Sequence, residues 1–257
     1  MPLISVMTAA ATGSDMNACA MLTNPETQDK IGLFSNLLLP KTSFLDPTVT
    51  YSVSKRQTAC GSADIMSHVM EGYFDMNPGL YMLDCFMEGL LKTVVKYAPV
   101  ALNEPDNYEA RANLLWAASW ASNDFGPGGR VNDWCCHRIE RMSELFNMTH
   151  GVGIAIVTPR WLEYCLDETT LPKYVQFGVQ VFGIDTSLAP MEIAKKAIEK
   201  LSEFFFDTLG LPSTLGELGI EEKEFRTMAQ HACAGQTLNG LKPLTEEDVM
   251  KIYEMCK

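Results

Sequence analysis

The spacing of apolar residues divides the chain into two parts. Residues 1–53 contain short apolar runs, such as PLISVMT, separated by glycine, proline and asparagine. This pattern is typical of short strands joined by loops. From Ser54 onward, apolar residues recur every three or four positions, which predicts amphipathic helices. We therefore expect a mainly α fold, in which a short β and loop region precedes an all-helical domain over residues 54–257.

The expected helices have recognisable ends. Ser54 is placed to cap the first one, and Thr245 with Asp248 resembles a capping box at the start of the last. The pattern predicts helices over residues 54–74, 80–102, 107–123, 132–147, 150–164, 171–183, 189–210, 221–235 and 244–257.

Composition and charge narrow the class of protein. Hydrophobic residues make up 47% of the 257 residues, and the formal net charge is −12. An acidic chain is a poor partner for nucleic acid or an anionic membrane, since both require a basic face. No long uncharged apolar run predicts a membrane span, and the N-terminus lacks the basic start of a secretory signal. Because none of the eight cysteines forms a CxxC pair, we expect reduced thiols and a cytoplasmic protein.

Three of the four histidines lie where they could bind one metal ion. Asp64 and His68 are four residues apart on one predicted helix, so both side chains face the same way. His137 lies on another predicted helix, and His150 lies at the start of a third. One carboxylate and three imidazoles suit Zn²⁺ or Fe²⁺. Two-residue ligand motifs also occur by chance, and His231 is more simply a structural histidine.

Other residues near His137 leave alternatives open. Cys135 and Cys136 could supply thiolates, but adjacent residues on a helix point about 100° apart, so both rarely bind one ion. The four tryptophans are expected in the core. Trp134 is the exception, because it precedes a proposed ligand by three residues.

Six segments, taken together and in order, resemble the iron-dependent (group III) alcohol dehydrogenases, particularly their butanol dehydrogenase and broad aldehyde reductase branch. The matching segments are residues 11–17, 44–74, 133–140, 149–161, 210–220 and 238–249.

The resemblance implies a fold, a reaction and a metal site. The fold is the helical metal-binding domain of the dehydroquinate synthase-like group III enzymes. Its metal, Fe²⁺ or Zn²⁺, would be bound by Asp64, His68, His137 and His150, and would polarise the oxygen of a small alcohol or aldehyde. NAD or NADP would exchange hydride with the adjacent carbon. The family also implies a homodimer.

The resemblance assigns cofactor contacts to the N-terminal part. Small hydroxyl residues and a glycine allow the backbone to approach a dinucleotide, and a lysine offers positive charge to phosphate or a hydrogen bond to ribose. The matching positions are Thr8, Thr12, Gly13, Ser14, Asn17 and Lys30.

The chain also departs from the family. We expect residues 1–53 to be the tail of an α/β nucleotide-binding domain whose body lies outside this sequence, so that the chain is truncated. The segment between His137 and His150 is one residue shorter than in the family. Arg141 stands where the family has a second histidine near the substrate, and it cannot act as a general base near neutral pH.

The function expected from the sequence is therefore a metal-dependent alcohol dehydrogenase or aldehyde reductase, present as a truncated chain. The catalytic residues other than the metal ligands cannot be assigned. One alternative is a catalytically incompetent metal- or partner-binding protein, which the expected truncation and the Arg141 replacement both favour. A metallohydrolase ranks lower, because the chain lacks an HExxH motif.

Overall fold

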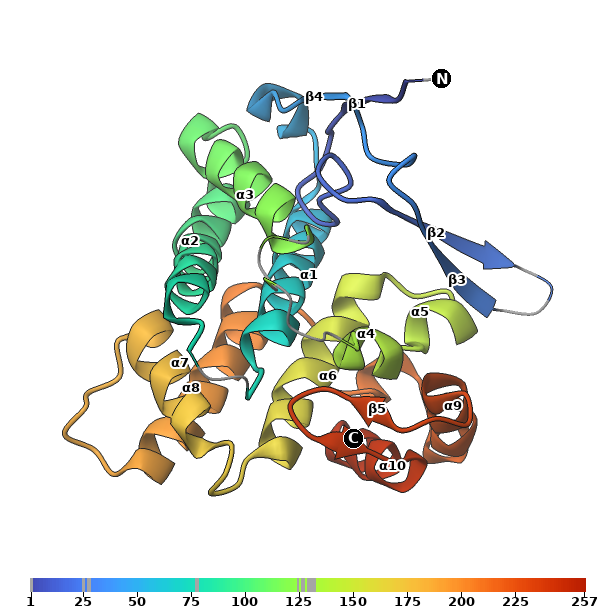
Figure 1. The fold of residues 1–257 in the computed structure, drawn as a ribbon, viewed down its shortest axis with the longest axis vertical. Coiled ribbons are helices and arrows are strands. Elements are labelled where there is room, and N and C mark those ends of the chain that lie inside the picture. The colour runs from blue at the N-terminus through green and yellow to red at the C-terminus, as the bar shows by residue number, and fades with distance from the viewer. Residues whose placement is uncertain are drawn as a thin grey trace.

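The computed structural model describes residues 2–24, 26, 29–76, 79–123, 125, 128 and 133–257. It confirms a mainly helical fold preceded by short strands (Figure 1). The helices are α1 (Lys55–Tyr73), α2 (Tyr81–Asn103), α3 (Tyr108–Ala121), α4 (Cys135–Ile139), α5 (Met142–Leu145), α6 (His150–Cys165), α7 (Leu171–Phe182), α8 (Pro190–Glu203), α9 (Phe225–Cys233) and α10 (Glu246–Met255). Shorter turns of helix are η1 (Pro47–Thr50), η2 (Phe204–Thr208), η3 (Gly216–Leu218) and η4 (Glu222–Glu224).

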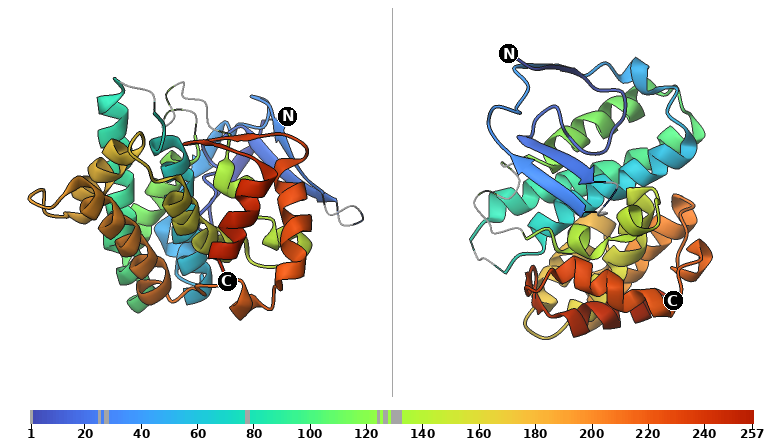
Figure 2. Two further views of the ribbon diagram at one scale, coloured as in Figure 1. Left: turned by 90° about the horizontal axis from the view of Figure 1, so that it is seen from below. Right: turned by 90° about the vertical axis from the view of Figure 1, so that its right-hand side faces the viewer.

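The strands pair two by two. Near the N-terminus, β1 (Ile4–Val6) runs parallel to β4 (Thr42–Phe44), and β2 (Cys19–Asn24) runs antiparallel to β3 (Asp29–Phe34). The β2–β3 hairpin extends away from the helical body (Figure 2). A third pair, β5 (Leu238–Asn239) with β6 (Pro243–Leu244), was not predicted, because two-residue strands leave no alternation to recognise.

Helix α1 lies at the centre of the molecule, between α2 and α3 on one side and α6 on the other (Figure 1). The predicted cap is present, since the Ser54 hydroxyl accepts a hydrogen bond from the Gln57 amide at 3.2 Å. Nearly every residue of α1 from Thr58 to Tyr73 is buried, including polar ones. Polar side chains at the centre of a fold need partners, and Asp64, Ser67 and Glu71 are three such buried side chains on α1.

One predicted helix is wrong in a way that shapes the site. The described part of 132–147 contains two short helices, α4 and α5, with Glu140 and Arg141 between them. Glu140 has ψ 87°, outside the helical range, and its carboxylate accepts hydrogen bonds from the Ser143 amide and hydroxyl, both at 2.8 Å. A side chain that caps the next helix competes with continuation of the first one. The helical pattern of the sequence does not reveal this competition.

The remaining expectations on helix ends and packing were mostly confirmed. The Thr245–Asp248 capping box is present at α10. Trp161 is fully buried, as expected, but Trp116 is 53% exposed, so its assignment to the core was wrong. Within the described residues, no helix is long and apolar enough to cross a membrane.

Candidate metal centre

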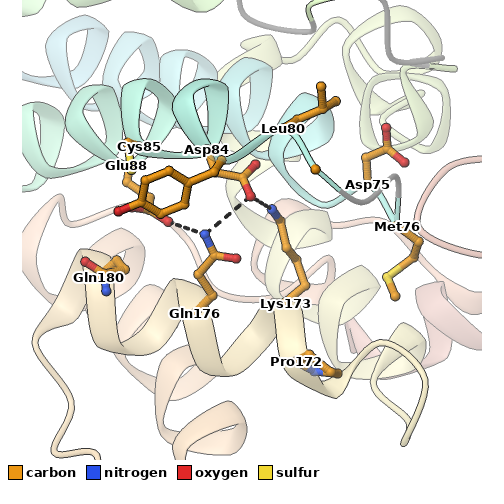
Figure 3. A pocket seen from close by; sticks show the side chains of 12 residues that line it. Asp75, Met76, Leu80, Asp84, Cys85, Glu88, Pro172, Lys173, Gln176 and Gln180 are labelled. Carbon is orange, nitrogen blue, oxygen red and sulfur yellow. Dashed lines mark hydrogen bonds and ion pairs between the residues drawn. The ribbon is translucent and has the colours of Figure 1, made fainter.

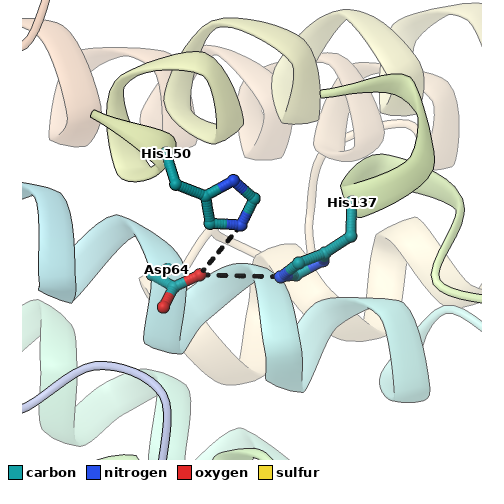
Figure 4. A group of neighbouring side chains, drawn as sticks. All are labelled: Asp64, His137 and His150. Carbon is teal, nitrogen blue, oxygen red and sulfur yellow. Dashed lines mark ion pairs between the residues drawn. The ribbon is translucent and has the colours of Figure 1, made fainter. Parts of the chain in front are cut away.

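Three helices carry the four predicted ligands. Asp64 and His68 come from the middle of α1, His137 from α4 and His150 from the first position of α6. Figure 4 shows the imidazoles of His137 and His150 directed at the Asp64 carboxylate. Asp64, His137 and His150 offer ligand atoms that all lie within 4.8 Å of one another, and the fourth predicted ligand, His68, is not part of that group.

The distances match those expected around a single ion. Asp64 Oδ1 lies 3.5 Å from His137 Nε2 and 3.7 Å from His150 Nε2. His68 Nε2 is 3.8 Å from the same oxygen. Two ligand atoms at about 2.1 Å from a tetrahedral ion would lie about 3.4 Å apart. Separations of this size are too long for good hydrogen bonds and suit atoms that share a metal.

Several polar atoms at this point are buried without a partner. Among the described residues, Asp64 Oδ1, His137 Nε2 and His68 Nδ1 are enclosed and have no hydrogen-bond partner. A buried polar atom without a partner costs free energy comparable to a lost hydrogen bond. One carboxylate and a set of imidazoles therefore fit a divalent cation such as Fe²⁺ or Zn²⁺.

A second carboxylate orients His137. Glu71, two turns after Asp64 on α1, pairs through Oε1 with His137 Nδ1, and its Oε2 accepts a hydrogen bond from the Cys136 amide at 2.8 Å. Metal-binding histidines commonly donate their other ring N–H to a carboxylate, which fixes the tautomer and the ring orientation. Glu71 thus leaves Nε2 of His137 free to face Asp64.

Glu140 plays the same part for His150. Its Oε2 pairs with His150 Nδ1, and the Glu140 side chain is fully buried. The break between α4 and α5 places this carboxylate beside α6, so the interrupted helix serves the site. The sequence analysis assigned no role to Glu71 or Glu140. For Glu71 the sequence did hold a signal, because its seven-residue spacing from Asp64 places both side chains on one face of the helix.

Two glycines allow α6 to approach closely. A Cβ at Gly151 would lie 2.3 Å from the carbonyl oxygen of Cys60 on α1, and a Cβ at Gly153 would lie 2.4 Å from Glu140 Oε1. Any larger residue at either position would push the helix away. The sequence HGVG therefore positions His150 against both α1 and the carboxylate that orients it.

The pKa values of the site shift in opposite directions. Burial alone would raise the pKa of Asp64, but the neighbouring imidazoles, His68 first among them, hold it below its usual range. Burial lowers the pKa of His68 to about 4. Burial would also lower the pKa of His137, but the charge of Glu71, the hydrogen bond to Glu71 and the charge of Asp64 raise it to about 10. An ion bound at His137 would therefore displace a proton at neutral pH.

Aromatic rings line one side of the centre. His68 and His137 stack with their ring centroids 4.6 Å apart, and Trp134 meets both rings nearly at right angles. Arg141, which replaces the expected histidine, pairs with Glu144 at 2.7 Å. Lys30 lies 3.6 Å from the same carboxylate, so two cations share one anion here.

The predicted cofactor residues lie mainly on the loop between β1 and β2. The Ala10 carbonyl of this loop packs against Gly61, one turn before Asp64 on α1. Thr8, Thr12 and Ser14 are exposed, whereas Gly13 is buried with φ +60° against α3. The Asn17 amide donates to the Thr12 carbonyl at 2.9 Å, so it shapes the loop.

The competing ligand candidates do not join the cluster. Cys135 and Cys136 are buried, and burial raises the pKa of both thiols well above the usual value. Thiols held in the neutral form are poor metal ligands. His231 lies on α9, outside the group that converges on Asp64.

A separate cavity of about 430 Å³ lies between the start of α2 and α7 (Figure 3). Lys173 pairs there with Asp84 at 2.7 Å, and Gln176 donates to Glu88 at 2.7 Å. These polar groups satisfy one another. The cavity lies beyond the end of α1, whereas Asp64 lies in its middle, so we assign it no part in the metal centre.

Comparison with known proteins gives consistent results over the whole chain. Residues 58–256 match the Fe-containing alcohol dehydrogenase family, C-terminal, and residues 1–47 match the iron-containing alcohol dehydrogenase family. The chain is 44% identical to NADH-dependent butanol dehydrogenase A of Clostridium acetobutylicum over 99% of its own length and 66% of that protein. It is 34% identical to the NADPH-dependent aldehyde reductase YqhD of Escherichia coli over 86% of the chain and 56% of that protein.

Solved structures show the same relationship. The crystal structure of E. coli YqhD superposes with a TM-score of 0.94 at 31% identity, and NADH-dependent butanol dehydrogenase A of Thermotoga maritima superposes with a TM-score of 0.91 at 33% identity. In both cases the match covers 100% of this chain and 66% of the other. The chain thus spans slightly less than two thirds of the length of these relatives.

Proposed function

Because this chain belongs to the iron-containing alcohol dehydrogenase family, we propose that it supplies the metal-binding part of an NAD(P)-dependent alcohol dehydrogenase or aldehyde reductase. The proposed metal ligands are Asp64, His68, His137 and His150, and the proposed ion is Fe²⁺ or Zn²⁺. The reaction would interconvert a small alcohol and its aldehyde, the substrate class that the names of the relatives suggest.

The observation that carries this proposal is the set of buried atoms without partners. Asp64 Oδ1 and His137 Nε2 face one another at 3.5 Å inside the protein, and Glu71 holds the other nitrogen of His137. A purely structural cluster would pair these atoms through hydrogen bonds. The arrangement instead directs ligand atoms at a common point and gives the imidazoles carboxylate support.

The side chains around the proposed site then have distinct chemical tasks. The ion, when bound, would supply Lewis-acid polarisation of a carbonyl or alcohol oxygen. Glu71 and Glu140 keep His137 and His150 oriented, and their negative charges strengthen the imidazoles as ligands. Trp134, His68 and the surrounding core limit access of water to the site.

We further propose that the loop from Thr8 to Asn17, with Lys30, contributes to holding NAD or NADP. The exposed hydroxyls of Thr8, Thr12 and Ser14 can donate to phosphate or ribose oxygens, and the Ala10 carbonyl of the same loop packs against Gly61, three residues before Asp64. Lys30 already lies 3.6 Å from Glu144, so a cofactor phosphate would compete for it. We also propose residues 1–53 and 54–257 as two functional parts, the first for cofactor and the second for metal.

A second candidate is a metal-binding protein that does not transfer hydride. Arg141 favours it, because an arginine cannot exchange a proton with substrate near neutral pH, and the Glu144 ion pair occupies it. Binding of the dinucleotide separates the two candidates.

The test uses the full chain purified without chelator. Metal content, binding of NADH and NADPH by titration calorimetry, and oxidation of each cofactor with butanal as acceptor should be measured together. The proposal expects one Fe²⁺ or Zn²⁺ per chain and aldehyde-dependent cofactor oxidation that disappears in Asp64→Ala. Metal without cofactor binding would favour the second candidate, and a chain that takes up neither ion would contradict both.

A further inference from the structure

Trp134 adopts a backbone conformation that its side chain disfavours. It has φ 52° and ψ 49°, in the left-handed region, directly before α4. Among the described residues, the other non-glycine residues with positive φ are Asn147, which tolerates this region, and Ala234. A bulky residue persists in the left-handed region only where its surroundings hold it there.

The surroundings of Trp134 include a built support. The Asp133 carboxylate accepts a hydrogen bond from the backbone N–H of Asn239 in β5 at 2.7 Å and pairs with Arg138 of α4 at 3.2 Å. Arg138 also donates to the Cys233 carbonyl at 3.2 Å. One carboxylate therefore ties the residue before Trp134 to the β5–β6 hairpin and to α4.

This backbone carries the indole onto two of the proposed ligands. The Trp134 ring centroid lies 5.6 Å from that of His68 and 5.3 Å from that of His137, with interplanar angles of 85° and 82°. The side chains of these two histidines are 10% and 17% exposed. The side chain of His150 is 27% exposed.

We propose that Trp134 is a positioning residue of the metal centre. Its indole fixes the stacked pair of His68 and His137 and closes that side of the centre to water, while Asp133 maintains the strained backbone that places it there. This inference rests on the proposed metal site, but it does not depend on hydride transfer. Outer groups that orient ligands typically change metal affinity by about 10- to 100-fold.

Co²⁺ is a suitable probe, because it binds imidazole and carboxylate ligands and absorbs visible light according to its coordination geometry. In the full chain, Co²⁺ should quench part of the tryptophan fluorescence. In Trp134→Phe, the fluorescence that Co²⁺ quenches should be absent. The absorption spectrum of bound Co²⁺ should match wild type, because phenylalanine retains a ring against the histidines. Trp116→Phe, which alters an exposed tryptophan on α3, should keep the quenching.

Trp134→Gly tests the positioning role, because glycine accepts positive φ without strain. It should fold, show an altered Co²⁺ spectrum and release Co²⁺ to EDTA about tenfold faster than wild type. Asp133→Asn keeps the indole but weakens its support, and should also release Co²⁺ faster. If Trp134→Gly does not fold, the release rate of Co²⁺ from Asp133→Asn decides whether Trp134 positions the ligands.

Wild-type spectra and release rates in Trp134→Gly would overturn the inference, as would wild-type release in Asp133→Asn should Trp134→Gly not fold. Failure of the wild-type chain to bind Co²⁺ would instead overturn the proposed metal site.

Discussion

The proposed metal centre and the N-terminal strand region differ in how far the rest of the chain buries them. Asp64, at that proposed centre, is 4% exposed, and its Oδ1 lies 3.5–3.8 Å from imidazole nitrogens carried by three helices. In the strand region, Phe34 is 72% exposed and Leu37 is 91% exposed, and the strands pair only two by two. Two-stranded sheets are marginally stable alone. The metal centre should therefore tolerate changes in the strand region, whereas cofactor binding should not.

The largest expected effect comes from removing a ligand. Asp64→Ala should weaken binding of Zn²⁺ by more than about 100-fold, because even a change in an orienting group costs 10- to 100-fold. Competition with a chromophoric chelator measures this. The His231→Ala variant is the matched control, since His231 lies outside the cluster and its loss should leave affinity unchanged. Equal losses in both variants would mean that the centre is not where we place it.

The orienting carboxylates should have the next largest effect. Glu71→Gln and Glu140→Gln should each weaken metal binding by about 10- to 100-fold, because a neutral amide holds an imidazole less firmly. Glu192→Gln, an exposed change on α8, should alter neither metal affinity nor stability appreciably. Wild-type affinity in both site variants would show that Glu71 and Glu140 have only a structural role.

Metal affinity should also depend on pH. The pKa of His137 is raised to about 10, so in the metal-free protein a proton must leave before an ion binds. Affinity should therefore rise about tenfold per pH unit between pH 7 and 9. In the same metal-free protein, protonated His137 contributes to the free energy of unfolding. This contribution is complete below about pH 6.5, the pKa of histidine in the unfolded chain, and is lost as the pH rises through about 10.

Calorimetry in buffers of different ionisation enthalpy counts the released protons. In Glu71→Gln, the rise of metal affinity with pH should occur at lower pH, because the variant lacks the main charge that raises the pKa of His137. A pH-independent affinity in the wild type would contradict this assignment.

A smaller effect is expected in the proposed cofactor loop, residues 8–17. Gly13→Ala would place a Cβ 2.4 Å from the Ala118 carbonyl oxygen at φ +60°, which should cost about 1–3 kcal/mol of unfolding free energy. We expect faster proteolysis of the 7–18 loop with unchanged Zn²⁺ affinity. Ser14→Ala, an exposed neighbour, should leave stability within about 0.5 kcal/mol of wild type. Loss of metal binding in Gly13→Ala would show that the two regions are coupled.

The smallest effect should come from the exposed apolar surface. Leu37→Ser should change the free energy of unfolding by less than about 0.5 kcal/mol, because Leu37 already contacts water. Trp161→Ala, in the fully buried core, should cost about 3–5 kcal/mol. Urea denaturation followed by circular dichroism compares them. A large loss in Leu37→Ser would mean that this side chain is covered in solution.

The sequence predicted the parts of this molecule that depend on local pattern. Helical periodicity located α1 and α6. The choice of His68, His137 and His150 as ligands rested mainly on the family resemblance, to which the scarcity of histidine added little. It did not predict the break at Glu140, because a carboxylate that caps one helix and supports a distant histidine is not part of a periodic pattern. Nor could spacing alone reveal that Trp134 takes a left-handed backbone, since the Asp133 support comes from a hairpin a hundred residues later.

The most direct test of the central claim is anomalous X-ray diffraction from crystals of the full chain loaded with Zn²⁺. The account predicts one strong peak per chain, at about 2.0–2.2 Å from Asp64 Oδ1, His137 Nε2 and His150 Nε2, with His68 beside it. A peak at Cys135 and Cys136, or no peak at Asp64 under saturating Zn²⁺, would contradict it.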